Sequence, residues 1–349
     1  MSITVASLLL SAALLLSPTQ TPLVIAHRGA SGELPEHTLA AYARAIAQGA
    51  DYIEPDLVMT KDGYLIARHE NEIGGTTDVA QKFLERKSVR LIDGQYIEGW
   101  FSEDFTLSEI RSLRARERLP FRSQAQNGQF RVPTFDEVIQ LVQAQSKAQN
   151  RTIGIYPETK HASYFRSIAL PLEPALLQTL QRYGLNHKDA PVYIQSFEVS
   201  NLQALRTQTS VRLVQLIEES GMPADQMLLA PGEDMLSYSS MITPAGLNQV
   251  RSYADGIGPY KRLILPDAGG RLMSPTNLVR DAHAVGLQVH PWTFRSDETY
   301  LHENHFGDPS AEYAAFFDAG VDGVFSDFTA HAVAARKAWL AQRDAAAQP

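Results

Sequence analysis

The sequence predicts an α/β fold, a (β/α)8 TIM barrel with an insertion over its C-terminal mouth. Three observations support this fold class: eight short apolar runs recur along the chain, capped helical segments separate several of them, and unusual polar residues gather where the runs end. In such a barrel the carboxyl ends of the strands surround the site. An open doubly wound sheet is the alternative. No G-x-G-x-x-G or G-x-x-x-x-G-K motif follows a strand, which weakens its nucleotide-binding versions.

The apolar runs are expected to be the barrel strands. They are nearly continuous rather than alternating, which is typical of parallel strands buried on both faces. They lie at residues 23–27, 52–58, 153–158, 192–197, 213–217, 255–259, 287–292 and 322–327.

Helix start and stop signals lie between these runs. Thr38 is a candidate N-cap for a helix that ends at Gly49, and residues 134–137 carry a capping-box pattern before a second amphipathic stretch. Residues 274–275, Ser-Pro, are expected to start a third helix, which ends at Gly286.

Composition excludes several classes of site. The chain has 349 residues, 44% hydrophobic content, a net charge of −8 and no cysteine. It can therefore bury a large core, but disulfides, thiolate metal sites and cysteine nucleophiles are excluded. The scattered lysines and arginines argue against nucleic acid as a partner.

The N-terminus is interpreted as a signal peptide over residues 1–21. Residues 6–17 form an apolar segment too short to span a bilayer, and small and polar residues follow it. Residues 1–4 lack Lys and Arg, so a short membrane anchor or an early structural segment is the alternative. The expected location is periplasmic or secreted, without stable membrane insertion after the signal is removed.

The remaining chain is expected to form one barrel domain over residues 22–340 with a tail over 341–349. Residues 70–132 are too long and too polar for a simple connection, so we interpret them as the insertion. A second long excursion covers about 219–250.

The stretch "IEPDLVMTKDGYLIARHE" places two acids inside an apolar run. Glu54 and Asp56 are two residues apart, so in a strand both point to one face, about 7 Å apart. Residues 61–63, Lys-Asp-Gly, predict a hairpin turn. A hairpin centred there returns His69 to a position opposite Pro55, beside the two acids.

Glu158, at the end of the next barrel strand, can supply a third carboxylate. Three acids without a required His or Cys ligand are typical of a hard cation such as Mg²⁺ or Ca²⁺. The alternative is a buried ion-pair network in which Glu54 and Asp56 pair with arginines such as Arg28. Spacing alone leaves both open.

Two histidines and two cations are expected at the same mouth. His27 and His69 suit a general base and a general acid, while Arg28 and Lys160 suit an anion such as phosphate. His290 is expected to support the site or simply to pack. The other histidines have no site context and are interpreted as surface or capping residues: His37, His161, His187, His283, His302, His305 and His331.

The block "AHRGASGELPEHTLAAYARAIAQGADYIEPDLVMTKDGYLIARHE" resembles the glycerophosphodiester phosphodiesterase family, in its larger exported bacterial type. Later matches are "IGIYPETK", "VYIQSFE", "ADGIGP", "VHPWTFRSD" and "GVFSDF", so the resemblance covers residues 23–328. It implies a phosphodiesterase barrel with an insertion, and a divalent cation, Ca²⁺ before Mg²⁺. By position it implies metal carboxylates at Glu54, Asp56 and Glu158, catalytic histidines at His27 and His69, and phosphate-binding residues at Arg28 and Lys160.

The chain departs from the family pattern at several positions. Glu70 stands where Asp is common after the second histidine, and "NEIGGTT" replaces a run that carries an arginine. The role of Glu70 and some substrate contacts are therefore open. His37 replaces a frequent Asn, and "ETK" replaces "EIK".

The resemblance implies metal-dependent hydrolysis of glycerophosphodiesters to sn-glycerol 3-phosphate and an alcohol. His27 is expected to be the base and His69 the acid, although the reverse order stays open. Gln195, Phe197 and Trp292 are expected to contact the glycerol, with barrel core as the alternative for the two aromatic rings. Two other functions stay open: a lipase D-type enzyme on lysophospholipids or sphingomyelin, and a binding protein without turnover. Oligomeric state and headgroup preference stay undetermined.

Overall fold

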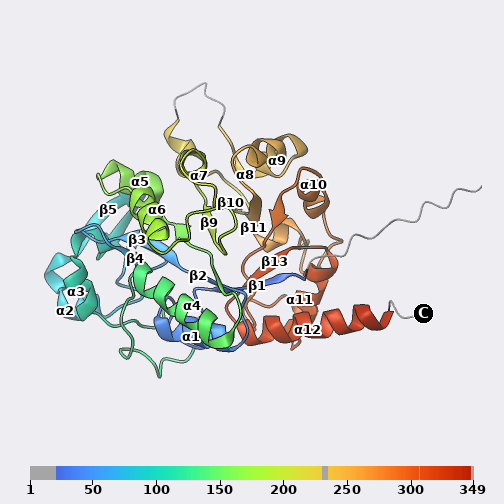
Figure 1. Cartoon of the computed structure of the whole chain (residues 1–349), viewed down its shortest axis with the longest axis horizontal. Helices are drawn as coiled ribbons and strands as arrows, with labels where there is room; N and C mark the ends of the chain where they lie inside the picture. The colour runs from blue at the N-terminus through green and yellow to red at the C-terminus, as the bar shows by residue number, and fades with distance from the viewer. Residues whose placement is uncertain (1–20, 230–234, 306, 347–349) are drawn as a thin grey trace, which may run out of the picture.

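Parallel strands form a barrel surrounded by helices in the computed structural model of this chain (Figure 1). The structure describes residues 21–229, 235–305 and 307–346, so the expected signal peptide lies almost wholly outside the described residues. The predicted fold class is confirmed. The barrel strands are β1 (Leu23–His27), β2 (Tyr52–Glu54), β3 (Asp56–Met59), β7 (Gly154–Ile155), β8 (Glu158–Thr159), β9 (Tyr193–Ser196), β10 (Arg212–Ile217), β11 (Gly256–Pro259), β12 (Gln288–Val289) and β13 (Gly323–Ser326).

The barrel closes through parallel pairing all round. β1 pairs with β2 on one side and β13 on the other, and β9, β10, β11 and β12 pair in chain order. Two single bridges, Ile155 to Val192 and Phe294 to Ser326, join the remaining neighbours. All eight predicted runs are therefore barrel strands.

Proline divides two of the runs that the sequence predicts as continuous strands. Pro55 separates β2 from β3, and Pro157 separates β7 from β8. Proline has no N–H to donate, so one ladder hydrogen bond is missing at each position, although the Pro55 and Pro157 carbonyls still accept from the Glu158 and Gln195 N–H groups. β2 and β7 then pair in one sheet, while β3 and β8 pair in the other.

The hairpin after β3 has the predicted register. β4 (Leu65–Ala67) pairs antiparallel with β3, with Leu57 opposite Ala67 and Met59 opposite Leu65. The same register continued places position 69 opposite position 55, and the Arg68 N–H donates to the Asp56 carbonyl at 3.0 Å. The turn therefore returns His69 to the acids.

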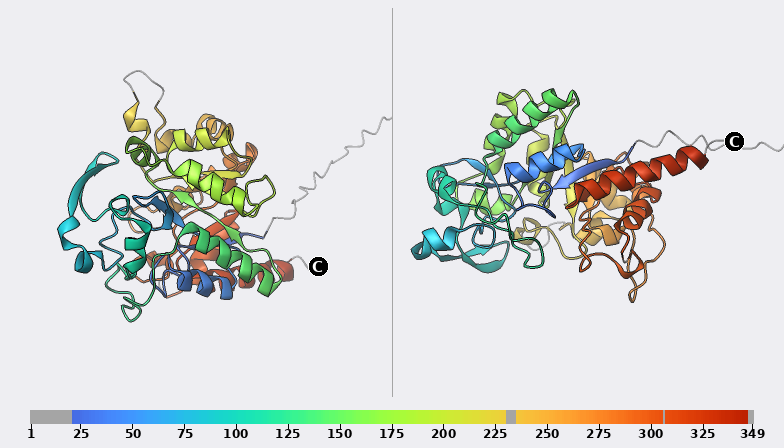
Figure 2. Two further views of the ribbon diagram at one scale, coloured as in Figure 1. Left: turned by 60° about the vertical axis from the view of Figure 1, so that its left-hand side comes forward. Right: turned by 90° about the horizontal axis from the view of Figure 1, so that it is seen from below.

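Residues 70–132 lie largely to one side of the barrel; their cyan segments are at the left of both views in Figure 2. Strands β5 (Ser88–Ile92) and β6 (Gln95–Gly99) form a hairpin, and the two residues of its Asp93-Gly94 turn both have positive φ. The Asp-Gly pair suits that turn because these residues tolerate the left-handed region. The elements of residues 70–132 are α2 (Val79–Lys82), β5, β6 and α3 (Leu107–Ser112), with 3₁₀ turns at Leu84–Arg86 and Ser102–Asp104.

Two of the three predicted helix starts are confirmed, at Thr38 and Thr134. The Thr38 side chain accepts from the Ala41 N–H, and Thr134 with Glu137 forms the predicted capping box. The outer helices are α1 (Leu39–Ala47), α4 (Phe135–Gln149), α5 (Ala162–Ser167), α6 (Leu172–Arg182), α7 (Val199–Arg206), α8 (Tyr238–Met241), α9 (Pro244–Arg251), α10 (Leu278–Ala284), α11 (Pro309–Asp318) and α12 (Thr329–Ala346).

The helix predicted to start at Ser274 instead begins at Leu278, so that prediction is wrong at its start. Thr276 explains the delay: its N–H donates to the Ile264 carbonyl at 2.9 Å, and its hydroxyl donates to the Leu263 carbonyl at 2.8 Å. These bonds tie residue 276 to the preceding loop before the helix begins. Gly286 follows the helix with φ 80°, as a C-terminal glycine does.

Aromatic side chains fill the barrel interior beneath the mouth. Tyr156 and Tyr193 stack at 4.8 Å, and the His290 ring contacts both edge-on. The Tyr156 hydroxyl lies 2.8 Å from His290 Nδ1, so this histidine packs in the core below the site. Across the described residues, no helix has both the length and the apolar character needed to cross a bilayer.

Candidate active site

One cavity of about 310 Å³ at the carboxyl ends of the strands brings the predicted residues together. Asp56 lies buried beside it. The remaining predicted residues all line it: His27, Arg28, Glu54, His69, Glu158, Lys160, Gln195, Phe197 and Trp292.

The three carboxylates converge. Oxygen atoms of Glu54, Asp56 and Glu158 lie within 4.8 Å of one another, and all three residues are at most 5% exposed. Strand pairing explains the convergence, because Asp56 is opposite Glu158 in the ladder of β3 and β8. Chain positions about a hundred residues apart thereby share one buried point.

Burial and mutual repulsion perturb this group. Burial, then repulsion from Asp56, raises the pKa of Glu54 well above its usual value. Burial likewise raises the pKa of Glu158 to about 7, against the opposing effect of Lys160, whose Nζ lies 3.0 Å from Glu158 Oε1. Three buried acids in this state are costly without a cation.

The donor set fits a divalent cation. Asp56 Oδ2 is hydrogen-bonded to His37 Nε2, but the buried Oδ1 of Asp56 has no hydrogen-bond partner among the described residues. The predicted arginine network is present only in part, since Arg28 Nε lies 3.6 Å from Asp56 Oδ2. That network leaves Oδ1 unused, whereas an oxygen-preferring cation would use it.

His37 belongs to this site, so its interpretation as a surface or capping residue is wrong. It is fully buried; its Nε2 lies 2.9 Å from Asp56 Oδ2, and its Nδ1 lies 2.7 Å from the Tyr42 hydroxyl. Burial would raise the pKa of Asp56, but His37 outweighs it and keeps that pKa well below its usual value. The position of His37 in the Pro-Glu-His-Thr motif was the available signal.

His27 is oriented by an acid that the sequence reasoning did not assign. Its Nδ1 lies 2.6 Å from Asp327 Oδ1, while Asp327 Oδ2 accepts from Arg122 at 2.6 Å and from Arg295 at 3.1 Å. Burial, then Arg28, lowers the pKa of His27 to about 4, so the ring is neutral near pH 7. It therefore donates from Nδ1 and presents a bare Nε2. The signal was Asp327 at the end of the last strand.

Arg28 is held by a second unassigned acid. Its Nη1 donates to Glu36 Oε2 at 3.0 Å, and Arg118 of the insertion donates to the same oxygen at 2.9 Å. The Arg28 backbone N–H donates to Glu54 Oε2 at 2.7 Å. The guanidinium is thus fixed beside the carboxylates.

His69 contacts the carboxylate of the residue that follows it. Its Nδ1 lies 2.8 Å from Glu70 Oε1, and Glu70 Oε2 lies 2.8 Å from His161 Nε2. Burial, then Arg28, lowers the pKa of His69 to about 3. His161 also contacts Asp93 at 2.6 Å, so its interpretation as a surface or capping residue is wrong. The other five histidines interpreted as peripheral do not line the cavity.

The expected glycerol-contacting residues form one wall. Phe197 and Trp292 meet edge-to-face at 5.7 Å, and Lys160 Nζ lies 5.6 Å from the Phe197 ring. Both rings are partly exposed to the cavity rather than enclosed in the core. Gln195 donates to Glu54 Oε1 at 3.0 Å, and its own buried Oε1 has no partner among the described residues.

A sequence model of the Glycerophosphoryl diester phosphodiesterase family matches residues 27–331. The chain belongs to this family. It is 38% identical over 326 residues to glycerophosphodiester phosphodiesterase GDPD6 of Arabidopsis thaliana, covering 89% of this chain and 85% of that protein. It is 35% identical to a glycerophosphodiester phosphodiesterase of Haemophilus influenzae, covering 88% and 87%. The chain is thus an enzyme of the phosphoric diester hydrolase class.

Solved structures agree on the fold. A putative glycerophosphoryl diester phosphodiesterase from Silicibacter pomeroyi aligns with TM-score 0.65 and 23% identity, covering 92% of this chain and 95% of that chain. A phosphodiesterase from Oleispira antarctica, solved in complex with the product sn-glycerol-3-phosphate, aligns with TM-score 0.58 and 19% identity, covering 91% and 97%.

A second cavity of about 460 Å³ adjoins the first. The two share Glu158, Lys160, Phe197 and Glu218 as walls. The second is lined by further carboxylates as well as apolar groups, including Glu70, Asp93, Glu198 and Tyr238. The carboxylate site therefore has open space on two sides.

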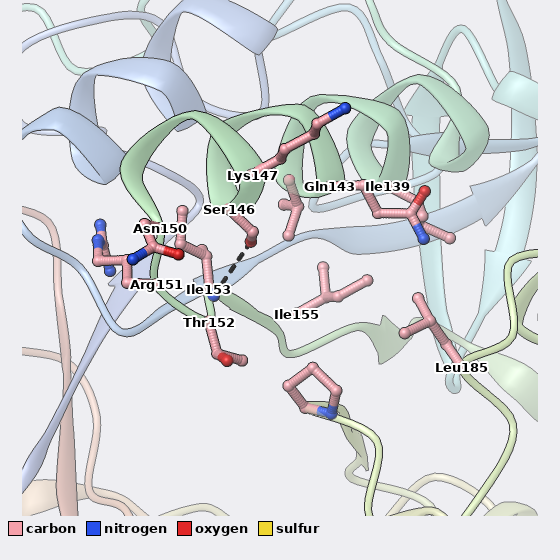
Figure 3. A pocket seen from close by; sticks show the side chains of 12 residues that line it. Ile139, Gln143, Ser146, Lys147, Asn150, Arg151, Thr152, Ile153, Ile155 and Leu185 are labelled. Carbon is pink, nitrogen blue, oxygen red and sulfur yellow. Dashed lines mark hydrogen bonds between the residues drawn. The ribbon is translucent and has the colours of Figure 1, made fainter.

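A third cavity, about 490 Å³ and drawn in Figure 3, lies away from these two. It lies beside α4 and the segments leading into β7 and β9, where Ser146 Oγ accepts from the Ile153 N–H at 3.2 Å. Its lining residues include no histidine and no carboxylate, so it lacks the groups that acid–base chemistry needs.

The ion pairs of His161 predict a pH-dependent contribution to stability. Burial would lower the pKa of His161, but hydrogen bonds with Asp93 and Glu70 outweigh it and raise the pKa from 6.5 to about 9. A raised folded-state pKa stabilises the fold fully below pH 6.5, and that stability is lost as the pH rises through 9. In metal-free protein we expect His161→Gln to cost about 1–2 kcal/mol at pH 6, after discounting for partial exposure of both acids, and much less at pH 9.5. Urea unfolding at both pH values measures this; a pH-independent difference would contradict it.

Proposed function

We propose that this enzyme hydrolyses glycerophosphodiesters to sn-glycerol 3-phosphate and an alcohol with the help of a divalent cation. One observation carries the proposal: two imidazoles, each with Nδ1 within 2.8 Å of a carboxylate oxygen, line one cavity with a converging carboxylate triad. Family membership and the product bound in the Oleispira antarctica phosphodiesterase support the choice of substrate class.

The cation would be held by Glu54, Asp56 and Glu158. When bound, it supplies Lewis-acid stabilisation of charge on the phosphoryl oxygens. All three ligands are carboxylates, which suits Ca²⁺, our first choice, and also Mg²⁺. Its positive charge would lower the raised pKa values of Glu54 and Glu158 and keep both ionised.

Arg28 and Lys160 would hold the phosphate. Both are buried cations at the cavity wall. Arg28 pairs with Glu36, and Lys160 pairs with Glu158. Paired cations of this kind keep their charge and direct it toward an anionic ligand. Phe197 and Trp292 would contact the carbon face of the glycerol, and Gln195 Oε1 would accept from a glycerol hydroxyl.

His27 would act as the base and His69 as the acid. The neutral His27 ring offers Nε2 to the attacking hydroxyl, while Asp327 stabilises the imidazolium that results. The negative charge of a bound phosphodiester raises the pKa of His69, and Glu70 stabilises its protonated form. The protonated ring then donates to the leaving alkoxide.

The attacking group is either water or the substrate's own hydroxyl. We favour neither, because both need one base and one acid. Chromatography of early products separates the two routes: a transient cyclic phosphate would contradict direct attack by water.

A lysophospholipid or sphingomyelin substrate needs an apolar track for an acyl chain. The cavity next to the site has apolar groups, but four carboxylates also line it, which favours a small polar alcohol: Glu70, Asp93, Glu198 and Glu218. A binding protein without turnover would not need two carboxylate-paired imidazoles.

We further propose that residues 1–21 are a signal peptide, that residues 22–340 form the mature catalytic domain with its insertion at 70–132, and that the enzyme is periplasmic or secreted. Sequencing the N-terminus of the mature protein from its host tests this. A mature chain that retains residues 1–21 would contradict it.

The deciding experiment measures release of sn-glycerol 3-phosphate from glycerophosphocholine by the purified protein. We expect turnover with Ca²⁺, weaker turnover with Mg²⁺, and a loss of at least about 10²-fold with chelator. Restored activity on adding back Ca²⁺ is the control for irreversible damage. Turnover that persists undiminished in chelator would overturn the metal-dependent proposal.

A further inference from the structure

Asp93, His161, Glu70 and His69 form a continuous chain of close polar contacts. His161 Nε2 lies 2.8 Å from one Glu70 oxygen, and the other Glu70 oxygen lies 2.8 Å from His69 Nδ1. On the far side, His161 Nδ1 lies 2.6 Å from Asp93 Oδ2. The family resemblance assigns no role to His161 or Asp93, and Glu70 itself replaces the more frequent Asp.

The two outer members come from different parts of the chain. His161 is the N-cap residue of α5, just after β8, whereas Asp93 is at the tip of the β5–β6 hairpin in the insertion. Both residues have left-handed backbones, with φ of 49° and 48°. At Asp93 this conformation belongs to the tight Asp-Gly turn, which places the residue at the tip of the hairpin.

The charges along the chain alternate. With a carboxylate at each ring nitrogen, His161 donates from both nitrogens and is an imidazolium. Its positive charge keeps the proton of His69 on Nδ1, because a carboxylate already paired with a cation is a poor proton acceptor. His69 Nε2 then stays directed into the cavity.

Glu70 has a competing partner. Lys160 lies close enough to influence its ionisation, and the Glu70 side chain is 41% exposed. Without His161, this partly exposed carboxylate can turn toward the Lys160 ammonium and release the His69 ring. The insertion hairpin thus holds His161 in place through Asp93.

We propose that the Asp93–His161 pair is a positioning clamp. It holds Glu70 against His69 and so keeps the His69 ring oriented to protonate the leaving alcohol. The proposal rests on the proposed function, in which His69 is the acid. Through Asp93, the insertion then contributes to the active site.

Substrates with different leaving groups test the clamp. An alcohol such as choline needs a proton to depart, whereas p-nitrophenolate departs without one. We expect His161→Gln and Asp93→Asn to lower kcat about 10- to 100-fold for glycerophosphocholine, and less than about 2-fold for glycerol 3-phosphate p-nitrophenyl ester. His283→Gln is the matched control, because His283 also pairs with an acid, Asp322, but lies away from the site. It should change neither rate.

Equal losses on the two esters would overturn the clamp, since a merely structural defect lowers both, and so would no loss on either. The proposed function is judged separately, by whether the unaltered enzyme hydrolyses glycerophosphocholine at all. Nitrogen-15 NMR of the histidine rings gives a readout independent of activity. We expect the Nδ1–H form of His69 in the unaltered protein and a mixture of tautomers in both variants; an unchanged tautomer would overturn the clamp.

Discussion

Glu54→Gln is expected to lower kcat/KM about 10³-fold or more while making the metal-free protein more stable. The substitution removes one of three converging carboxylates and keeps the side-chain shape. Its new amide group can donate to the Gln195 Oε1 atom, which now has no partner among the described residues. Gln195 rotates its amide to accept this bond.

The stability gain follows from the perturbed ionisation of Glu54. Burial and Asp56 raise its pKa well above the usual value, so its ionised form is unfavourable in the metal-free fold. We expect a gain of about 1 kcal/mol without metal, together with loss of the rise in Tm that Ca²⁺ gives the unaltered protein. Thermal unfolding with Ca²⁺ and with chelator measures both effects.

Glu173→Gln is the matched control. Glu173 is also buried, but it pairs with Arg166 and Asn201 among the outer helices. We expect this variant to keep its activity and its stabilisation by Ca²⁺. If Glu54→Gln retained either property, the carboxylate triad would not be the metal site.

Asp327→Asn is expected to lower kcat on the order of 10³-fold by trapping His27 in the wrong tautomer. The arginines fix how the new amide is oriented. Arg122 and Arg295 both donate to the oxygen that faces them, so the amide oxygen stays on that side and the NH2 group faces His27. His27 Nδ1 must then accept, which moves the ring proton to Nε2. A base that already carries its proton at the reactive nitrogen cannot accept another from the nucleophile.

Steady-state kinetics on glycerophosphocholine checks this prediction, with Asp297→Asn as control. Asp297 accepts from the same Arg122 side chain at 2.6 Å but is not bonded to His27. We therefore expect the control to keep most of its activity. Comparable losses in the two variants would mean that the arginine network, rather than the tautomer of His27, limits the rate.

The fold was predictable in outline because its signals are local. Apolar runs, capping residues and turn residues act over a few positions, and they located all eight barrel strands and the caps at Thr38 and Thr134. The hairpin register was also predictable, because a short turn leaves few ways to pair its flanking strands. The start of α10 was not, since the loop contacts of Thr276 decide it.

Sequence by itself determined the family, the barrel, and nine of the residues that line the main cavity. A motif read along one strand and its hairpin already places Glu54, Asp56 and His69 together. Only the tertiary structure decided which acids and bases support them. His27 meets Asp327 across 300 positions, and His161 meets Asp93 across 68. Contacts of this length depend on how the barrel closes and where the insertion folds back, and no short-range pattern encodes either.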